Sequence, residues 1–234
     1  MEQRGCFRCE PRRAGENSEA GKEGAVTENA GRSKEELFAR QASYSLRGIA
    51  ILMVMASHYG EWYASSIGIP ALTQFLTGLG RYGVDIFFVM SGYAMAKNAA
   101  ASGPPGADFW KKRLLGTYVP YLILSGIIEI AAGGTWTPER VFRYLTAQDY
   151  WFIFNIMVFY LAFFAAFRLK KLRIAVLAAV ILVFSVWLRE AGRQDFWYVS
   201  NLAFPLGAAC GLYEEKLLLW KRGKEPWPAA ACTL

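Results

Sequence analysis

The sequence predicts an all-α membrane protein, a polytopic bundle of about six transmembrane helices that follows a disordered N-terminal tail. Two observations lead to this fold class. Hydrophobic residues make up 54% of the 234 residues, and they occur in long blocks with few charges. The basic residues, which give the chain a net charge of +7, fall mainly in alternate connections between those blocks.

Each apolar block is interpreted as one crossing, because a helix needs roughly 20 residues to cover about 30 Å of hydrocarbon. Asp85 interrupts the second block. The fifth block is short, and it can span the bilayer if Arg173 and Arg189 at its ends extend toward water. The predicted crossings are residues 46–58, 83–96, 114–133, 150–167, 174–188 and 196–213.

Three regions are predicted along the chain. Residues 1–41 form a polar cytoplasmic tail, which is expected to be disordered because it has too few large apolar residues to offset its ordering entropy. This tail lacks the apolar core of a signal peptide, so the first membrane helix is expected to act as an uncleaved targeting signal. Residues 42–222 form the membrane domain, and residues 223–234 form a short C-terminal tail.

The distribution of the basic residues predicts the topology. An excess of Lys and Arg marks cytoplasmic loops, so both termini are expected in the cytoplasm and the protein in the cell (cytoplasmic) membrane. This role accounts for the basic charge, and nucleic acid is therefore not an expected partner, whereas the lipid bilayer is. The predicted inner connections carry Lys97, Lys111, Lys112, Arg113, Arg168, Lys170, Lys171, Arg173, Lys216, Lys221, Arg222 and Lys224.

The four cysteines, Cys6, Cys9, Cys210 and Cys232, form no plausible disulfide framework. Cys6 and Cys9 have the spacing of half a zinc site, but no second pair and no nearby histidine completes it. Free thiols in a reducing cytoplasm are therefore expected, with no metal site.

The outer connection between the third and fourth crossings, residues 134–149, contains a predicted amphipathic helix. Thr137 is its expected cap, Pro138 occupies the first helical position, and Glu139 follows in the first turn. This helix is expected to lie on the outer face of the membrane.

His58 is the only histidine and lies in the first apolar block. An ionisable group inside a bilayer is costly and is by default a candidate functional site. Arg47 lies eleven residues earlier, about 16 Å along a helix and roughly 20° past three full turns, so the two share a face that Glu61 continues. Three residues can also align by chance. A proton relay in a small transporter is another interpretation, and it would require pH-dependent flux.

Three motifs occur in order along the chain. They are Ser45-Leu-Arg-Gly-Ile-Ala-Ile-Leu-Met-Val-Met-Ala-Ser-His58, Gly83-Val-Asp-Ile-Phe-Phe-Val-Met-Ser-Gly-Tyr93 and Phe109-Trp-Lys-Lys-Arg-Leu-Leu-Gly-Thr-Tyr-Val-Pro120. Together they resemble the acyltransferase 3 family of integral membrane enzymes, over roughly residues 42–216. Trp151-Phe-Ile153 with Tyr160, and Phe204-Pro-Leu-Gly207, resemble later landmarks of the family less strongly.

The resemblance implies an acyltransferase that moves an acyl group, most often acetyl, from acyl-coenzyme A to a hydroxyl of a carbohydrate or cell-surface glycan. Acyl-coenzyme A is the donor substrate, and no bound cofactor is expected. His58 matches the histidine taken as essential in the family, either as general base or as an acyl carrier. Arg47 matches the supporting arginine, and Asp85 could orient the imidazole. The alternative for Asp85 is a structural pair with Arg81 one turn earlier.

The resemblance also implies a donor site at Lys111, Lys112 and Arg113, where cationic side chains at a helix start suit the phosphates of coenzyme A. Arg113 matches the first arginine of the family's arginine-x-x-arginine pair, and Gly116 stands where the second would be. Tyr44 replaces an acidic residue that usually precedes the arginine matched by Arg47.

Four residues are expected to line the substrate site: Glu61, Ser91, Tyr150 and Trp151. Ser91 with Gly92 could instead be a close-packing patch, and Tyr150 with Trp151 an interfacial aromatic belt. The family usually has about ten crossings, whereas about six are predicted here. The alternative function is therefore a truncated, catalytically inactive membrane scaffold or transport component of the same family, and a partner chain or an oligomer is possible.

Overall fold

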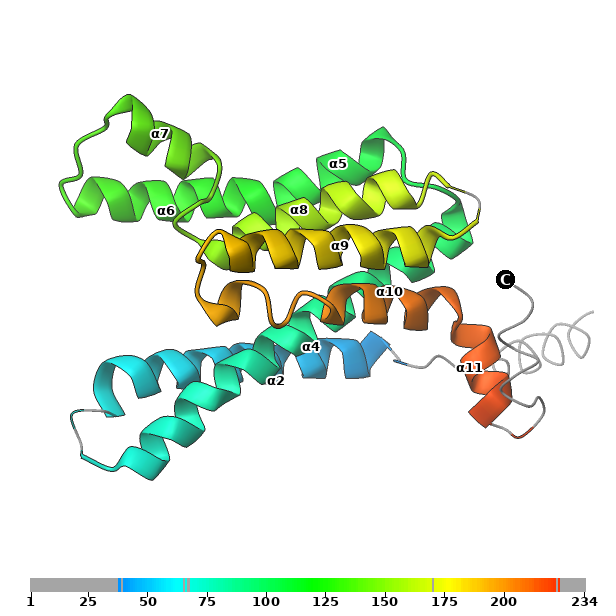
Figure 1. Ribbon diagram of the computed structural model, residues 1–234, viewed down its shortest axis with the longest axis horizontal. Coiled ribbons are helices and arrows are strands. Elements are labelled where there is room, and N and C mark those ends of the chain that lie inside the picture. The colour runs from blue at the N-terminus through cyan, green and yellow to red at the C-terminus, as the bar shows by residue number, and fades with distance from the viewer. Residues whose placement is uncertain are drawn as a thin grey trace, which may run out of the picture. The chain divides into compact units, whose positions relative to one another are not determined.

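The computed structural model describes residues 38, 40–64, 66, 68–169, 171–221 and 223. All regular secondary structure in these residues is helical, which confirms the predicted all-α class. Nearly all of the predicted tail, residues 1–41, lies outside the described residues, as do residues 224–234. The elements in Figure 1 are α2 (Arg40–Tyr59), η1 (Gly60–Ala64), α4 (Pro70–Ser102), α5 (Ala107–Arg113), η2 (Leu114–Tyr118), α6 (Val119–Ala131), α7 (Pro138–Leu145), α8 (Trp151–Ala166), α9 (Arg173–Glu190), η3 (Asp195–Trp197), α10 (Ala203–Leu212) and α11 (Glu214–Lys221).

Helix α4 is much longer than the predicted second crossing, since it runs for 33 residues. Pro70 opens it at the first helical position, where the missing N–H has no intrahelical acceptor. Gly103 closes it with a φ of 87°, a conformation that glycine adopts without strain. Asp85 lies inside this helix and does not interrupt it, because one half-buried carboxylate leaves the backbone hydrogen bonds intact.

The predicted sixth crossing, residues 196–213, is not one helix. It begins with the short turn η3 and continues as a loop to α10, which has only 10 residues. The fully buried side chain of Asn201 accounts for the break: it donates to Ser185 Oγ at 3.0 Å and accepts from Asn155 Nδ2 at 3.1 Å. Asn155 also donates to the carbonyl of Trp197 at 2.6 Å, which pins η3 to α8.

One described helix is long and apolar enough to cross a membrane by itself. It is the continuous run Ala107–Ala131, which joins α5, η2 and α6 over 25 residues. Helices α8 and α10 are apolar but shorter. The helical class is therefore confirmed, and the number of crossings stays a prediction.

Aromatic side chains fill the core between α4, α8 and α10. The ring of Phe159 lies 5.0 Å from that of Phe88 and 5.1 Å from that of Phe204, and none of the three side chains reaches solvent. Leu177 and Ile181 of α9 close the core from a further side. Large apolar contacts of this kind set the positions of the helices that carry the candidate site.

Glycines allow α4 to pass close to two neighbouring helices. A Cβ atom at Gly92 would meet the backbone of Phe204, and one at Gly207 would meet the backbone carbonyl of Val89. On the side facing α2, a Cβ at Gly83 would lie 2.8 Å from the carbonyl oxygen of Ala50. Close backbone approach through small residues is typical of helix packing in membranes.

Candidate active site

His58 lies in the last turn of α2 and is held on two sides. Its Nδ1 is 3.3 Å from Glu61 Oε2, and its ring stacks on Trp62 with the ring centroids 5.2 Å apart and an interplanar angle of 22°. The side chains of His58 and Glu61 are 51% and 52% exposed. Of the two neutral tautomers, the carboxylate favours the one with the proton on Nδ1, which leaves the lone pair on Nε2.

A π-helical turn directly follows His58, and a second follows Arg113. These turns are η1 (Gly60–Ala64) and η2 (Leu114–Tyr118). Single π-turns inserted in α-helices are rare and are frequent at functional sites. His58 and the predicted donor residues at the end of α5 therefore each lie near an irregularity of this type.

Arg47 lies on the same unbroken helix as His58, so the predicted alignment of the two side chains on one face holds for α2. Ala50 and Ser57 form the buried stripe of α2 beside that face, where they meet Gly83 and Gly80 of α4. His58 therefore flanks the α2–α4 contact and stays open to the surroundings. Within the described part of the chain, Arg47 makes no hydrogen bond or ion pair.

The two predicted site residues of α4 are half-buried and do not contact the imidazole through a hydrogen bond. Asp85 forms no hydrogen bond or ion pair with any described residue, so the alternative pairing with Arg81 does not occur in this structure. Ser91 precedes Gly92, whose missing side chain lets α4 approach α10. This position fits the close-packing interpretation of the Ser91–Gly92 pair.

The predicted donor residues differ in their surroundings. Lys111 and Lys112 are exposed in the last turn of α5. Arg113 is half-buried, and its guanidinium carbon lies 5.7 Å from the ring centroid of Phe109 and 5.3 Å from that of Tyr160. Aromatic faces hold the guanidinium by cation–π attraction without occupying its N–H groups, which stay available for an anion.

Tyr150 and Trp151 lie at the start of α8. The ring of Tyr150 meets Tyr121 edge to face at 5.3 Å, and Trp151 lies 5.3 Å from Phe196. In Figure 1, α2 ends at the left and α5 begins at the right. The described residues thus form separate groups around His58, Arg113 and Tyr150, and no described hydrogen bond or ion pair joins one group to another.

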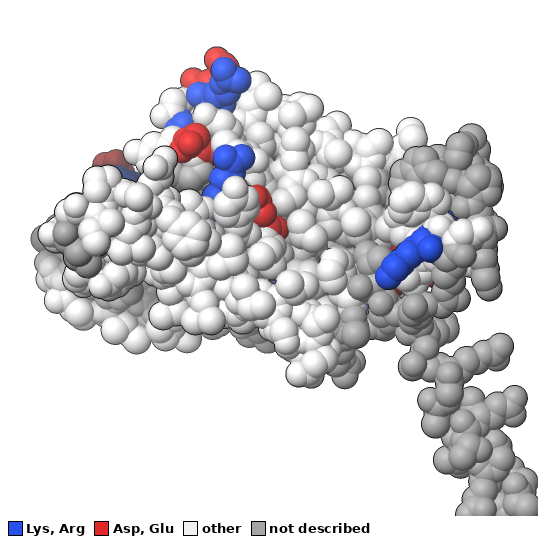
Figure 2. Space-filling model, turned by 90° about the horizontal axis from the view of Figure 1, so that it is seen from below, with Lys and Arg blue, Asp and Glu red and all other residues white. Residues whose placement is uncertain are grey.

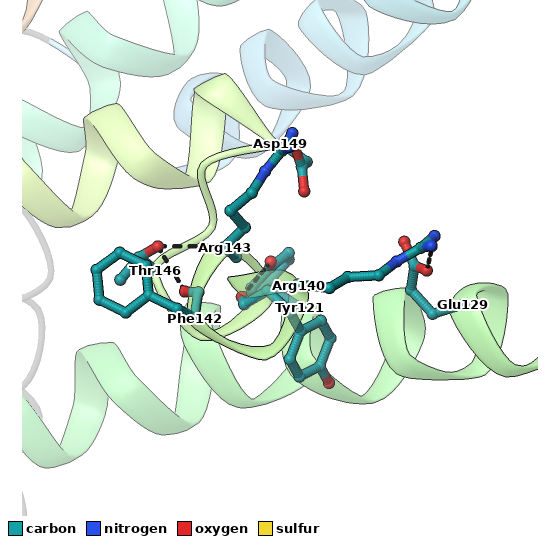
Figure 3. A network of polar contacts seen from close by, with 8 residues as sticks. Tyr121, Glu129, Arg140, Phe142, Arg143, Thr146 and Asp149 are labelled. Carbon is teal, nitrogen blue, oxygen red and sulfur yellow. Dashed lines mark hydrogen bonds and ion pairs between the residues drawn. The ribbon is translucent and has the colours of Figure 1, made fainter. Parts of the chain in front are cut away.

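The predicted helix after the third crossing is confirmed as α7. Thr137 caps it by accepting a hydrogen bond from the backbone N–H of Arg140 at 3.3 Å. Figure 3 shows how charged side chains tie this helix to its neighbours: Arg140 Nη2 lies 2.6 Å from Glu129 Oε2 of α6, and Arg143 pairs with Asp149. The hydroxyl of Tyr121 also donates to the carbonyl of Tyr144 at 2.7 Å.

Charged side chains are sparse on the face that Figure 2 shows, where uncharged residues cover most of the surface. Exposed large apolar side chains are frequent on α2, α4, α6 and α9. Examples are Leu52 and Met55 on α2, Phe75 on α4, Ile127 on α6 and Val183 on α9. Such a surface is costly in water and suits lipid.

The sequence interpretation missed several side chains that shape these groups. Trp62 follows His58 by four residues and Phe109 precedes Arg113 by four, so the helical spacing could have identified both contacts. Glu214 of α11 accepts from Tyr93 at 2.5 Å and pairs with Lys97 at 3.1 Å. This cluster uses a lysine that the sequence assigned only to topology.

Two further expectations concern thiols and metals. Cys210 is a half-buried free thiol, and the other three cysteines lie outside the described residues. Among the side chains that the structure describes, no group of three or more His, Cys, Asp or Glu is placed to hold a metal ion.

Comparison with known proteins gives one match. The model of the acyltransferase 3 family, described as an acyltransferase domain, matches residues 45–234. No curated protein and no solved structure matches the chain. The matched region begins just before Arg47 and includes His58, the residues around Asp85 and the basic cluster at Arg113. The chain therefore belongs to the acyltransferase 3 family, whose members are membrane proteins with transferase activity.

Proposed function

We propose that this protein is a multipass enzyme of the cytoplasmic membrane that transfers an acyl group, acetyl in the first instance, from acyl-coenzyme A to a hydroxyl of a carbohydrate or cell-surface glycan. The observation that carries this proposal is the contact between His58 and Glu61 in a chain of an acyltransferase family. The contact orients an imidazole whose side chain is half exposed. Accessible, oriented imidazoles are the usual proton acceptors in acyl transfer.

In the proposed mechanism Glu61 accepts a hydrogen bond from Nδ1–H of His58, and Trp62 fixes the plane of the ring. Nε2 takes the proton of the acceptor hydroxyl while that oxygen attacks the thioester carbonyl. The C–S bond then breaks, and the imidazolium returns its proton to the departing thiolate. A positioned general base of this kind contributes about 10²- to 10⁴-fold in rate.

A second route uses the same side chain as a nucleophile. Nε2 attacks the thioester, the C–S bond breaks, and coenzyme A leaves as the thiolate. The acceptor hydroxyl then attacks the acyl-imidazolium, neutral imidazole is restored, and the proton of the hydroxyl neutralises the thiolate. Both routes use the lone pair of Nε2, and of the two neutral tautomers the contact of Nδ1 with Glu61 favours the one that has this lone pair.

We assign the donor phosphates to the basic cluster at α5. Arg113 would supply the fixed bidentate contact, and Lys111 and Lys112 would add exposed positive charge. Arg47 lies between the inner end of α2 and His58, a position from which a cation could guide an anionic group toward the imidazole. The positive-inside rule favours a cytoplasmic position for this cluster and both termini, on the side where acyl-coenzyme A is available.

Replacement of Arg113 by alanine is expected to weaken acyl-coenzyme A binding about tenfold or more, because a charge-assisted hydrogen bond contributes roughly 1.5–3 kcal/mol. Binding of a labelled donor to purified protein in nanodiscs measures this. Arg168→Ala is the matched control, since its guanidinium lies 4.3 Å from the ring centroid of Phe164 and it is also a predicted inner residue. Equal losses in both variants would show that only the general positive charge matters.

Replacement of Gly116 by arginine is expected to strengthen donor binding about tenfold. A Cβ atom at Gly116 meets no atom within 4 Å, so the larger side chain fits without displacing a neighbour. The added guanidinium restores the spacing of the arginine pair three residues after Arg113. Titration with acetyl-coenzyme A measures the change, and Gly116→Gln controls for side-chain size. An unchanged or weaker affinity in the arginine variant would argue against a donor site at η2.

Transfer itself is tested with proteoliposomes that contain the purified protein, acetyl-coenzyme A labelled in the acetyl group, and a set of oligosaccharide acceptors. The proposal expects labelled, ester-linked acetyl on a saccharide, and it expects that label to require His58. Label on lipid or protein, with none on a saccharide, would reject the carbohydrate as acceptor while keeping acyl transfer.

A further inference from the structure

We propose that the apolar face of α7 is inserted among the acyl chains of the bilayer beside α6, so that α7 is a membrane-embedded helix that does not span. The face is formed by Val141, Phe142 and Leu145, which are 36%, 59% and 48% exposed. The position of α7 relative to the bilayer does not depend on the proposed catalytic activity.

The sequence of α7 separates apolar from charged side chains. On a helix Val141, Phe142 and Leu145 fall within an arc of about 100°, and Glu139 lies about 160° away from Val141. Arg140 and Arg143 also lie outside the apolar arc. A short helix with one apolar face and one charged face is typical of segments that lie in a membrane interface.

The contacts of α7 with α6 leave this apolar face unpacked. Tyr144 reaches α6 by donating a hydrogen bond to the carbonyl of Leu122, and its hydroxyl lies beside Gly126. Arg140 reaches Glu129 of the same helix. Tyr144 and Arg140 are on the side of α7 opposite Phe142, so the apolar face points away from α6.

Four of the five charged side chains on and beside α7 form ion pairs within the protein, and Glu139, on the face opposite Val141, is the exception among the described residues. Glu129 pairs with Arg140, and Arg143 pairs with Asp149. Unpaired charges oppose entry into hydrocarbon, whereas neutral pairs that are hydrogen-bonded carry a much smaller penalty. This pattern of pairs fits a lipid environment better than an aqueous surface, where each charge would be solvated alone and the pairs would contribute little.

Helix α7 contacts α6 at Leu122, Gly126 and Glu129, inside the run of residues that is long enough to cross a membrane. Five large apolar side chains of α6 are more than half exposed: Ile123, Leu124, Ile127, Ile128 and Ile130. Trp136, 45% exposed, lies just before α7, at a position where tryptophan commonly marks the interface. Helix α7 therefore lies beside an apolar helix whose exposed side chains suit lipid.

The test compares two neighbouring positions on opposite faces of α7. Val141→Cys and Glu139→Cys are introduced singly into the full chain with Cys6, Cys9, Cys210 and Cys232 replaced by serine, labelled with the fluorophore NBD, and reconstituted in phosphatidylcholine vesicles. We expect doxyl-labelled lipid to quench the probe at 141 at least about twofold more than the probe at 139, and aqueous iodide to show the reverse order.

Two results would overturn the proposal. Strong iodide quenching at both positions would place α7 in water. Protection of position 141 from both quenchers would show that protein covers the face, as in a contact with a second copy. Size-exclusion chromatography in detergent confirms that each variant is folded, and Leu145→Cys, on the same face, replaces Val141→Cys if that variant aggregates.

Discussion

Replacement of His58 by alanine is expected to lower acyl transfer by about 10²- to 10⁴-fold, with membrane insertion and helix content unchanged. The imidazole supplies the base or the nucleophile in both proposed routes, so its loss removes the reaction. Half of the side chain is exposed, and its described contacts are with Glu61 and Trp62 alone, so its loss opens no cavity in the core. Initial rates of labelled acetyl transfer, with helix content from circular dichroism, measure the effect.

Glu61→Gln is the companion variant to His58→Ala. The amide keeps an oxygen that can accept from Nδ1–H and removes the negative charge, so a smaller loss than that of His58→Ala is expected. Wild-type transfer rates in His58→Ala would reject the catalytic assignment. Equal, complete losses in both variants together with reduced helix content would point to a structural role for the end of α2.

Replacement of Gly207 by alanine is expected to destabilise the helix bundle by about 2 to 3 kcal/mol. The added Cβ would overlap the backbone carbonyl of Val89, and a backbone atom cannot move aside as a flexible side chain can. The clash would separate α4 from α10 and disturb Phe88 and Phe204 in the core next to it. Thermal unfolding in detergent, followed by circular dichroism, measures the loss as a lower Tm.

Gly78→Ala is the matched control, because Gly78 lies in α4 and a Cβ there meets no atom within 4 Å. That variant is expected to be unchanged or slightly more stable, since alanine favours a helix over glycine by roughly 0.5–1 kcal/mol. If Gly207→Ala unfolds at the same temperature as the wild type, α4 and α10 do not pack as closely as the structure shows.

Much of the fold follows from the sequence, because long apolar blocks have few alternatives to helices. The bounds of α8 and α9 lie within a few residues of the predicted ones. The break before α10 was not predicted, since it depends on Asn155 and Ser185, which lie far from Asn201 in sequence and meet it only after folding. The length of α4 was underestimated, because the prediction covered only the stretch around residues 83–96 and the helix continues on both sides of it.

The candidate site was predictable where its residues share one helix. The spacing of Arg47, His58 and Glu61 placed them on one face, and the observed contact of His58 with Glu61 agrees with that spacing. The π-turns were not predictable, because no residue pattern marks them. The placement of Arg113 against Tyr160 depends on the packing of α5 on α8, which hydropathy does not reveal.

The most direct test of the catalytic claim is single-turnover transfer by the reconstituted wild-type protein. Acetyl-coenzyme A labelled in the acetyl group is mixed with proteoliposomes and an oligosaccharide acceptor, and the products are identified by mass spectrometry. The proposed function predicts ester-linked acetyl on the oligosaccharide. It also predicts the release of one coenzyme A thiol for each acetyl group transferred. Donor binding without any transfer to an acceptor would contradict it and favour a membrane scaffold that does not catalyse the reaction.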